Sequence, residues 1–130
     1  MNMKKLLLSI SLLLLTTLLS FGQDLSSSTE KRVNLITRVM ASELGLNESE
    51  YLRLKALNRE RVVKSDEIAE LYAGDQTLQT KKLLELETSF DKKLKAMLSP
   101  SQLATYAAYR QSPDTELALS EVGKTPAKKE

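Results

Sequence analysis

Hydrophobic side chains recur at helical spacing in several segments of the chain. The clearest stripe lies in residues 77–98, where apolar side chains follow one another at steps of three or four residues, the spacing that places them on one face of an α-helix. Its members are Leu83, Leu86, Phe90, Leu94 and Met97. A shorter stripe consists of Val33, Ile36, Met40 and Leu44. The chain is therefore predicted to be helical over most of its length.

Capping residues divide the helical pattern into separate elements. Ser27 and Glu30 have the spacing of a capping box, in which each side chain satisfies a backbone N–H of the first turn. The helix that begins there is predicted to end at Gly45, because glycine enters the left-handed conformation at little cost. Asn47 and Glu50 have the same spacing and predict the start of a second helix.

The second helix is predicted to be long and to be followed by a tight reversal. About 26 residues without proline or glycine separate Asn47 from Gly74, which corresponds to roughly 39 Å of helix. Its apolar residues are Leu54, Leu57, Ile68, Leu71 and Tyr72 near the ends and Val62 and Val63 in the charged middle. Gly74 is the predicted stop and Asp75 the predicted cap of the next helix. Two long helices joined so closely are expected to form an antiparallel hairpin.

A fourth, short helix is predicted after Ser99. Pro100 suits the first helical position, where its missing N–H costs nothing, and Gln102 completes a capping box with Ser99. Leu103, Tyr106 and Tyr109 follow at steps of three residues. We expect the two tyrosines to clamp this helix on the hairpin, with each hydroxyl bonded to water or to a backbone group.

Residues 1–22 have the three-part pattern of a secretory signal peptide. Lys4 and Lys5 precede an apolar run, and the small residues Ser20 and Gly22 follow it. The run is shorter than the roughly 20 apolar residues of a transmembrane helix. We therefore expect cleavage after Gly22 and a periplasmic protein; the alternative is an uncleaved N-terminal anchor.

The remainder of the chain has the size of one domain. It contains 130 − 22 = 108 residues, of which 23–112 are expected to form the helical domain and 113–130 a flexible polar tail. Removal of two lysines leaves 19 − 2 = 17 basic residues against 17 acidic ones, so this part has no net charge. Such a composition does not suggest a nucleic-acid partner.

The composition also argues against catalysis and metal binding. The chain has no histidine and no cysteine, so the commonest general base and the strongest nucleophile are missing. Asp66, Glu67 and Glu70 cluster in the second helix, but a solvated charged face accounts for them better than an active site. Met40 and Met97 lie on apolar stripes, where methionine fills cores. We therefore expect no enzyme, no cofactor and no metal.

Two helix starts in the chain have the same construction. The segments "LNESEYLRLKALNR" and "LSPSQLATYAAYRQ" each place a leucine, a capping residue, two spacers and Glu or Gln before an apolar helix, 52 residues apart (98 − 46). The first copy contains Leu46, Asn47 and Glu50, and the second contains Leu98, Ser99 and Gln102.

With these two motifs, residues 28–112 resemble the Spy and CpxP group of periplasmic proteins, whose mark is a pair of L-T-x-x-Q motifs at two helix starts. The second copy is close to that pattern, and the first departs from it while keeping the capping chemistry. The resemblance implies an all-α fold of four helices, a long antiparallel hairpin with short flanking helices, that pairs into a cradle-shaped homodimer. It also implies a non-enzymatic protein similar to the ATP-independent chaperones of this group, which holds unfolded clients or acts in the envelope stress response. The alternatives are an accessory regulator of an envelope sensor kinase or anti-sigma factor, and a purely structural oligomer.

Client holding requires apolar side chains on the surface beside charges of both signs. Most leucines of the stripes are better explained by the hairpin core and a dimer contact. The surplus apolar residues, which we expect to bind clients, are Leu52, Val63, Tyr72 and Leu84.

Overall fold

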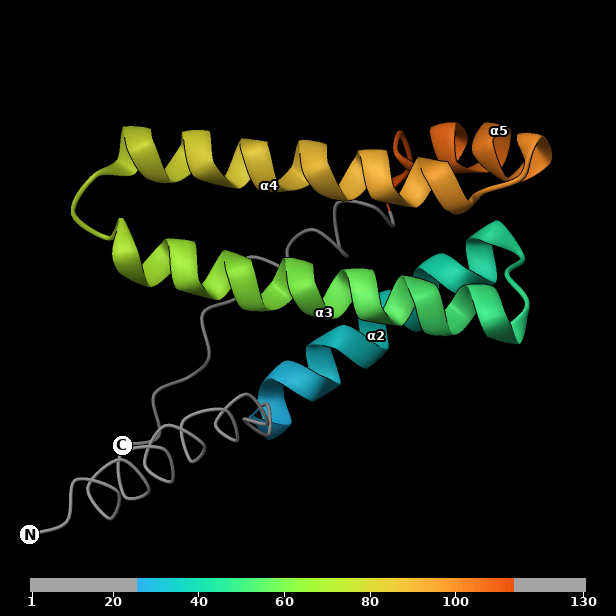
Figure 1. Ribbon diagram of the computed structural model, residues 1–130, viewed down its shortest axis with the longest axis horizontal. Helices are drawn as coiled ribbons and strands as arrows, with labels where there is room; N and C mark the ends of the chain where they lie inside the picture. Colours follow the sequence, from blue (N-terminus) through green and yellow to red (C-terminus); the bar gives the residue numbers. More distant parts are fainter. Residues whose placement is uncertain (1–25, 114–130) are drawn as a thin grey trace, which may run out of the picture.

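The computed structural model describes residues 26–113, which form four α-helices and, within that range, no strand. The helices are α2 (Ser27–Leu44), α3 (Glu48–Leu71), α4 (Gln76–Met97) and α5 (Pro100–Tyr109) (Figure 1). The all-α prediction is therefore confirmed. The expected signal peptide and residues 114–130 of the expected tail lie outside the described residues.

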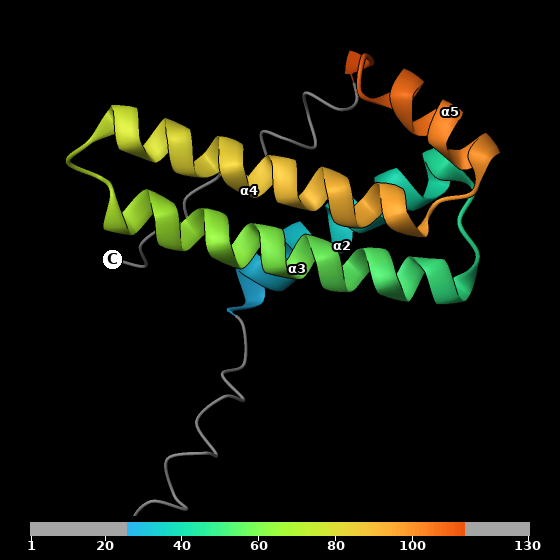
Figure 2. The ribbon, with the colours of Figure 1, turned by 45° about the horizontal axis from the view of Figure 1, so that its top comes forward.

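The two long helices, α3 and α4, run antiparallel and side by side (Figures 1 and 2). Asp75 begins α4 as predicted, because its side chain accepts a hydrogen bond from the backbone N–H of Leu78 at 3.0 Å. The prediction for Gly74 is wrong: α3 already ends at Leu71, and Gly74 does not adopt the left-handed conformation. The intervening turn is closed by the Asp75 N–H, which donates to the Tyr72 carbonyl at 3.0 Å.

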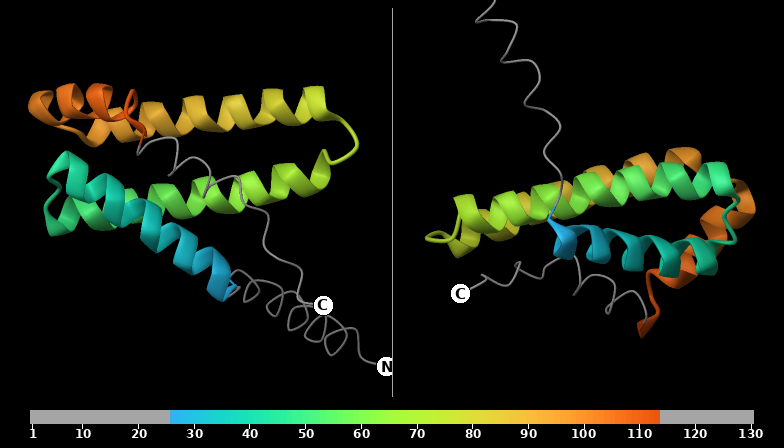
Figure 3. Two further views of the ribbon diagram at one scale, coloured as in Figure 1. Left: turned by 180° about the vertical axis from the view of Figure 1, so that it is seen from behind. Right: turned by 90° about the horizontal axis from the view of Figure 1, so that it is seen from below.

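Helices α2 and α5 lie on the same side of this hairpin, toward the end opposite the α3–α4 turn (Figure 3). In the view from behind, α2 crosses over α3 along a diagonal. It packs against both α3 and α5, although α5 follows it by 55 residues (100 − 45) along the chain. The half of the hairpin nearest the turn therefore consists of only two described helices.

The start of α2 differs from its predicted cap by one residue. Ser26, rather than Ser27, is the N-cap, and its hydroxyl accepts from the backbone N–H of Thr29 at 3.3 Å. Glu30 does not close a capping box, because Thr29 occupies the third helical position after Ser26. The Glu30 carboxylate instead accepts from Arg59 of α3 at 3.0 Å. Three consecutive serines offer the same capping oxygen, so the residue type does not fix the register.

The end of α2 follows the sequence prediction. Gly45 has φ of 62° and ψ of 44°, which is the left-handed conformation. Its N–H and that of Leu46 both reach the carbonyl of Ala41, so this orphan acceptor of the last helical turn is satisfied. The chain then turns directly into α3.

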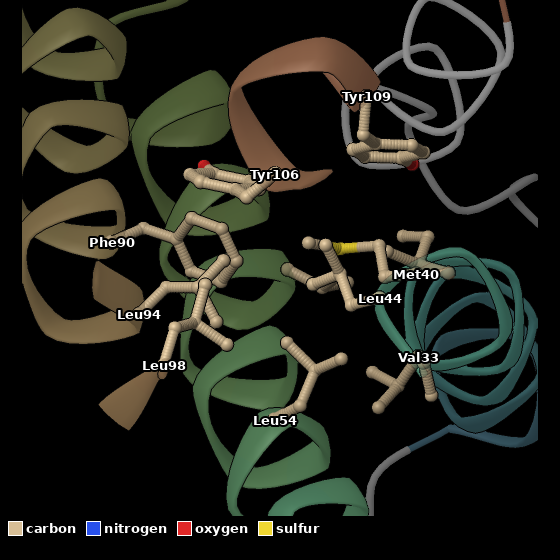
Figure 4. Packing of buried hydrophobic residues seen from close by; sticks show 12 residues of the cluster. Val33, Met40, Leu44, Leu54, Phe90, Leu94, Leu98, Tyr106 and Tyr109 are labelled. Atoms are coloured by element: carbon tan, nitrogen blue, oxygen red, sulfur yellow. The ribbon is translucent and has the colours of Figure 1, made fainter. Parts of the chain in front are cut away.

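The apolar core is concentrated where α2, α3, α4 and α5 meet (Figure 4). Each helix contributes one stripe, and Tyr106 of α5 lies over Phe90 of α4 in this view. The buried members are Val33, Ile36, Met40, Ala41, Leu44, Leu54, Val62, Phe90, Leu94, Leu98, Tyr106 and Tyr109. Both Met40 and the partly buried Met97 thus belong to the core, as the stripes predict.

A small polar group is enclosed between α2 and α3. The Asn58 amide nitrogen donates to the Thr37 hydroxyl at 3.1 Å, and that hydroxyl donates to the Val33 carbonyl at 2.7 Å. Both side chains are fully buried. The Asn58 amide oxygen has no hydrogen-bond partner, which makes this a costly position within the described core.

Candidate functional site

The two motif copies form capping boxes, as predicted. In the first, the Glu50 N–H donates to the Asn47 side-chain oxygen and the Asn47 N–H donates to the Glu50 carboxylate, both at 2.9 Å. In the second, the Gln102 N–H donates to the Ser99 hydroxyl at 3.3 Å and the Ser99 N–H donates to the Gln102 side-chain oxygen at 2.9 Å. Each box therefore satisfies two backbone groups at the start of α3 or α5.

The fold brings these two helix starts together. The Gln102 amide nitrogen donates to the Glu50 carboxylate at 3.1 Å, across 52 residues of sequence. We call the four linked residues Asn47, Glu50, Ser99 and Gln102 the motif clasp. The motif leucines lie beneath it, since Leu98 is buried and Leu46 packs against the same core. The repeat predicts the capping chemistry, but nothing in the spacing predicts that one box binds the other.

The hydrogen bonds of the motif clasp position the starts of two helices. Its side-chain oxygens are occupied by N–H donors, and the Ser99 hydroxyl has only a serine hydroxyl, that of Ser101 at 3.2 Å, as a further side-chain partner. No group that could remove a proton from Ser99 is bonded to it among the described residues. The clasp therefore fixes where α3 and α5 begin relative to each other.

A second anchor holds α5 on α4. Asp91 accepts hydrogen bonds from the Tyr106 hydroxyl at 3.0 Å and from Arg110 at 2.9 Å, and Lys95 lies 2.9 Å away. Burial raises the pKa of Asp91, but the bonds from Lys95 and Tyr106 and the charge of Arg110 outweigh it, so the pKa is lowered. Burial and the Asp91 bond raise the pKa of Tyr106. The clamp predicted for Tyr106 thus ends on a carboxylate rather than on water or backbone.

Charged side chains in the middle of α3 bind the helices on either side. Arg61 donates to both carboxylate oxygens of Glu87 in α4, at 2.8 and 2.6 Å, while its guanidinium lies 4.2 Å from the centre of the Phe90 ring. Asp66 accepts two hydrogen bonds from Arg32 of α2, at 2.8 and 3.0 Å. The sequence analysis missed both pairs. The signal was present, because Arg61 continues the buried α3 series of Leu54 and Asn58 at helical spacing.

The three clustered carboxylates of α3, Asp66, Glu67 and Glu70, do not share one role. Asp66 is held by Arg32, whereas Glu67 and Glu70 are exposed. No group of three or more histidine, cysteine, aspartate or glutamate side chains that could hold a metal ion is found in residues 26–113. In the same range no helix combines the length and the apolarity needed to cross a membrane.

The four residues predicted to bind clients do not form one patch. Leu52 and Leu84 are exposed, with 59% and 67% of their surface accessible. Val63 and Tyr72 are half-buried, and Tyr72 lies roughly 30 Å from Leu52 along α3. Val63 is one turn from both Arg59 and Asp66, which bind α2, so it faces the start of that helix.

Two further leucines are exposed that the sequence analysis did not select. Leu71, at the end of α3, has 75% of its surface accessible, and Leu35 of α2 has 45%. Leu35 lies in a shallow open hollow of about 580 Å³ between α2 and α3, lined by Leu35, Arg38, Val39, Ser42, Glu43 and Tyr51. A second open hollow of about 530 Å³ at the start of α3 is lined by Asn47, Glu48, Ser49 and Leu52.

Comparison with family models, with curated proteins and with solved structures finds no match to this chain.

Proposed function

We propose that this protein is a non-enzymatic periplasmic chaperone that holds unfolded proteins without ATP. The observation that carries the proposal is the exposure of two leucines, Leu52 and Leu84, each of which lies between opposite charges. Lys81 and Glu87 lie one turn to either side of Leu84, and Glu48 and Lys55 lie one turn to either side of Leu52. An unfolded chain offers apolar and charged groups in no fixed order, and such a surface can bind many of them.

Separated exposed leucines suit a chaperone that releases its clients without ATP. Burial of one leucine side chain contributes about 2 kcal/mol, so a single contact is weak and short-lived. An unfolded client that spans several such sites gains affinity from their number rather than from any one of them. Release then needs no ATP, because each contact breaks and reforms independently.

The paired helix starts and the composition support the same proposal. The motif clasp unites the residues on which the resemblance to the Spy and CpxP group rests. The absence of histidine and cysteine from the printed chain disfavours hydrolytic chemistry, so holding rather than processing of the client fits this chain better.

The test is a light-scattering assay in which an unfolding model client aggregates at equal molar ratio with this protein and without ATP. Suppression by the natural chain is expected. Leu52→Ser and Leu84→Ser are each expected to weaken client binding by on the order of tenfold, because each removes one apolar contact. The matched controls are Arg53→Ser and Lys92→Ser, which change exposed residues of the same two helices without removing a leucine.

Circular dichroism of the four single variants and of the Leu52→Ser, Leu84→Ser double variant establishes whether the helices are intact. Full suppression by the Leu52→Ser, Leu84→Ser double variant would contradict the role of these leucines. No suppression by the natural chain, together with specific capture of one envelope protein, would favour the regulator of a sensor kinase or anti-sigma factor instead.

A further inference from the structure

The 580 Å³ hollow between α2 and α3 combines apolar side chains with two unpaired charges. Leu35 is exposed in it, and Val39 and Tyr51 are half-buried side chains that also pack against the core. Arg38 and Glu43 are exposed and make no ion pair or side-chain hydrogen bond within residues 26–113. Covering the apolar side chains would remove them from water, which is favourable. The hollow therefore suits an occupant that has both apolar and charged groups.

The described part of the chain ends close to α2. Helix α5 packs against α2, and Tyr109 at its end is buried. The Ser112 N–H donates to the Tyr109 carbonyl at 2.9 Å, so the chain stays near the end of α5 after the helix has finished. In the view from below, α2 lies between α3 and the end of α5 (Figure 3). A segment that follows Pro113 can therefore reach the hollow by crossing over α2.

The chain beyond Pro113 is long enough for this path. The printed sequence continues for 17 residues after it (130 − 113). An extended chain covers about 3.3–3.6 Å per residue, so the six residues from Pro113 to Leu119 reach up to about 20 Å. A helix with its side chains is about 10–12 Å across. Leu119 can therefore pass over α2 and enter the hollow.

The segment beyond Pro113 carries apolar and charged residues in a definite order. Its large apolar residues are Leu117, Leu119 and Val122, in an otherwise mostly polar sequence. The acidic Glu121 and then the basic Lys124 follow the leucines. The segment thus presents leucines, a negative charge and a positive charge in that order.

The lining of the hollow has the complementary order along α2, which is Leu35, then Arg38, then Glu43. Leu35 and Glu43 are eight residues apart, or about 12 Å along the helix axis. The five residues from Leu119 to Lys124 span between about 7.5 Å as a helix and about 17 Å when extended, which brackets that distance. A segment that runs parallel to α2 can therefore match its leucines and both of its charges at once.

We propose that residues 117–124 bind in this hollow of their own chain, with Glu121 paired with Arg38 and Lys124 paired with Glu43. A short connection gives the segment an effective concentration in the millimolar range, so a contact of only millimolar affinity is occupied about half of the time. The segment then alternately covers and exposes Leu35. This assignment rests on α2, Tyr51 and the printed sequence, and it holds whether or not the protein retains clients.

The test uses a spin label on a Ser120→Cys variant of the purified protein, because the chain contains no cysteine of its own. Amide signals are followed by NMR, and paramagnetic broadening is expected at Arg38, Val39 and Tyr51. No broadening is expected at Leu71, which lies about 30 Å from Tyr51 along α3.

Charge reversals test the assigned pairing. Glu121→Arg and Arg38→Glu each place like charges opposite one another, and each is expected to reduce the broadening at Tyr51 by on the order of threefold. The Arg38→Glu, Glu121→Arg double variant restores opposite charges in reversed order and is expected to restore the broadening. Glu116→Arg is the matched control, since it makes the same reversal in the same segment outside the assigned pairs and should leave the broadening unchanged.

Four results would overturn the proposal: no broadening at the hollow, broadening that neither single reversal reduces, a double variant no better than the single ones, and broadening that arises between chains. The last is measured by mixing spin-labelled chains with unlabelled, isotope-enriched chains, where binding within one chain gives no effect. Circular dichroism shows whether the helices persist in Arg38→Glu. Rescue by the double variant distinguishes a lost charge pair from a damaged helix, because Glu121→Arg leaves the sequence of α2 unchanged.

Discussion

Asp91 is the residue at which α4 and α5 are joined most tightly. Its carboxylate receives donors from its own helix, through Lys95, and from α5, through Tyr106 and Arg110. Hydrogen bonds to a charged acceptor are stronger than those between neutral groups. Because these donors favour the ionised form, the pKa of Asp91 in the folded protein is below its ordinary value.

We predict that acid weakens the fold through this residue. A lowered pKa in the folded state means that the unfolded chain binds more protons as the pH falls below about 4, so stability that is present above this value is lost as the pH falls through the folded-state pKa. Asp91→Asn is expected to lower stability by about 1–2 kcal/mol at pH 7 and to reduce the further loss on acidification. Thermal unfolding between neutral and acidic pH measures both effects.

Glu60 is a second acid-sensitive group, which the Asp91→Asn variant retains. Hydrogen bonds from Lys64 and Lys93 lower its pKa as well, so some acid sensitivity is expected to persist in the Asp91→Asn variant. An Asp91→Asn variant with the same acid response as the natural chain would contradict the role of Asp91.

At the scale of the element, the two inter-helix glycines have different conformations. Gly45 has a positive φ and lies where α2 turns into α3, whereas Gly74 lies outside the left-handed region in the turn before α4. A Cβ added at either position would meet no atom within 4 Å. Any difference between alanine substitutions at the two sites therefore comes from the backbone alone.

We predict opposite outcomes for these substitutions. Gly45→Ala is expected to destabilise the protein by about 1 kcal/mol, because an alanine in the left-handed conformation is strained. Gly74→Ala is expected to be neutral or to stabilise by up to about 1 kcal/mol, because it restricts only the unfolded chain. Urea unfolding of the pair provides the comparison, and equal effects would refute the assignment of Gly45 as the left-handed cap.

The element boundaries show which local signals the sequence contains. Asn47, Asp75 and Ser99 are correct predictions. Glu50 and Gln102 follow Asn47 and Ser99 at the spacing of a capping box, and Asp75 directly follows the glycine of the turn. The start of α2 was misplaced by one residue because Ser26, Ser27 and Ser28 are equivalent as caps. Contacts between elements are less predictable: the Arg61–Glu87 pair and the Glu50–Gln102 bond depend on how far α4 is shifted along α3, which no local pattern encodes.

The candidate site was predictable to a similar extent. The sequence identifies the motif residues and finds Leu52 and Leu84, which are exposed. It does not distinguish these from Val63 and Tyr72, because half-burial of the latter depends on tertiary packing. The exposed Leu35 of α2 was missed for the same reason, since apolar spacing does not reveal which apolar residues of a helix are covered.

At the scale of the whole molecule, the described domain depends on one small core. Leu94 lies within it and is fully buried, close to Phe90 and Leu98 of the same stripe (Figure 4). A domain of this size is typically stable by only 5–15 kcal/mol, about 0.05–0.15 kcal/mol per residue. One cavity in the core is therefore a large perturbation.

We predict that Leu94→Ala destabilises the protein by about 2–5 kcal/mol, from lost burial and from the cavity that is left. Leu84→Ala removes the same atoms from an exposed site of the same helix and is expected to change stability by less than about 0.5 kcal/mol. Urea unfolding at 25 °C measures both. A small effect of Leu94→Ala would indicate that the four helices do not share one cooperative core.

The bond between Glu50 and Gln102 also constrains how the chain reaches this fold. Closing a flexible loop of 52 residues costs roughly 3.5 kcal/mol from the length-dependent part of the loop entropy alone. One hydrogen bond contributes a net of about 1 kcal/mol, which does not offset that cost. The bond therefore forms only after α3 and α4 have paired. A slip of α4 by one helical turn, about 5.4 Å, would carry Gln102 out of reach of Glu50, so the motif clasp selects the correct register of the hairpin rather than driving its formation.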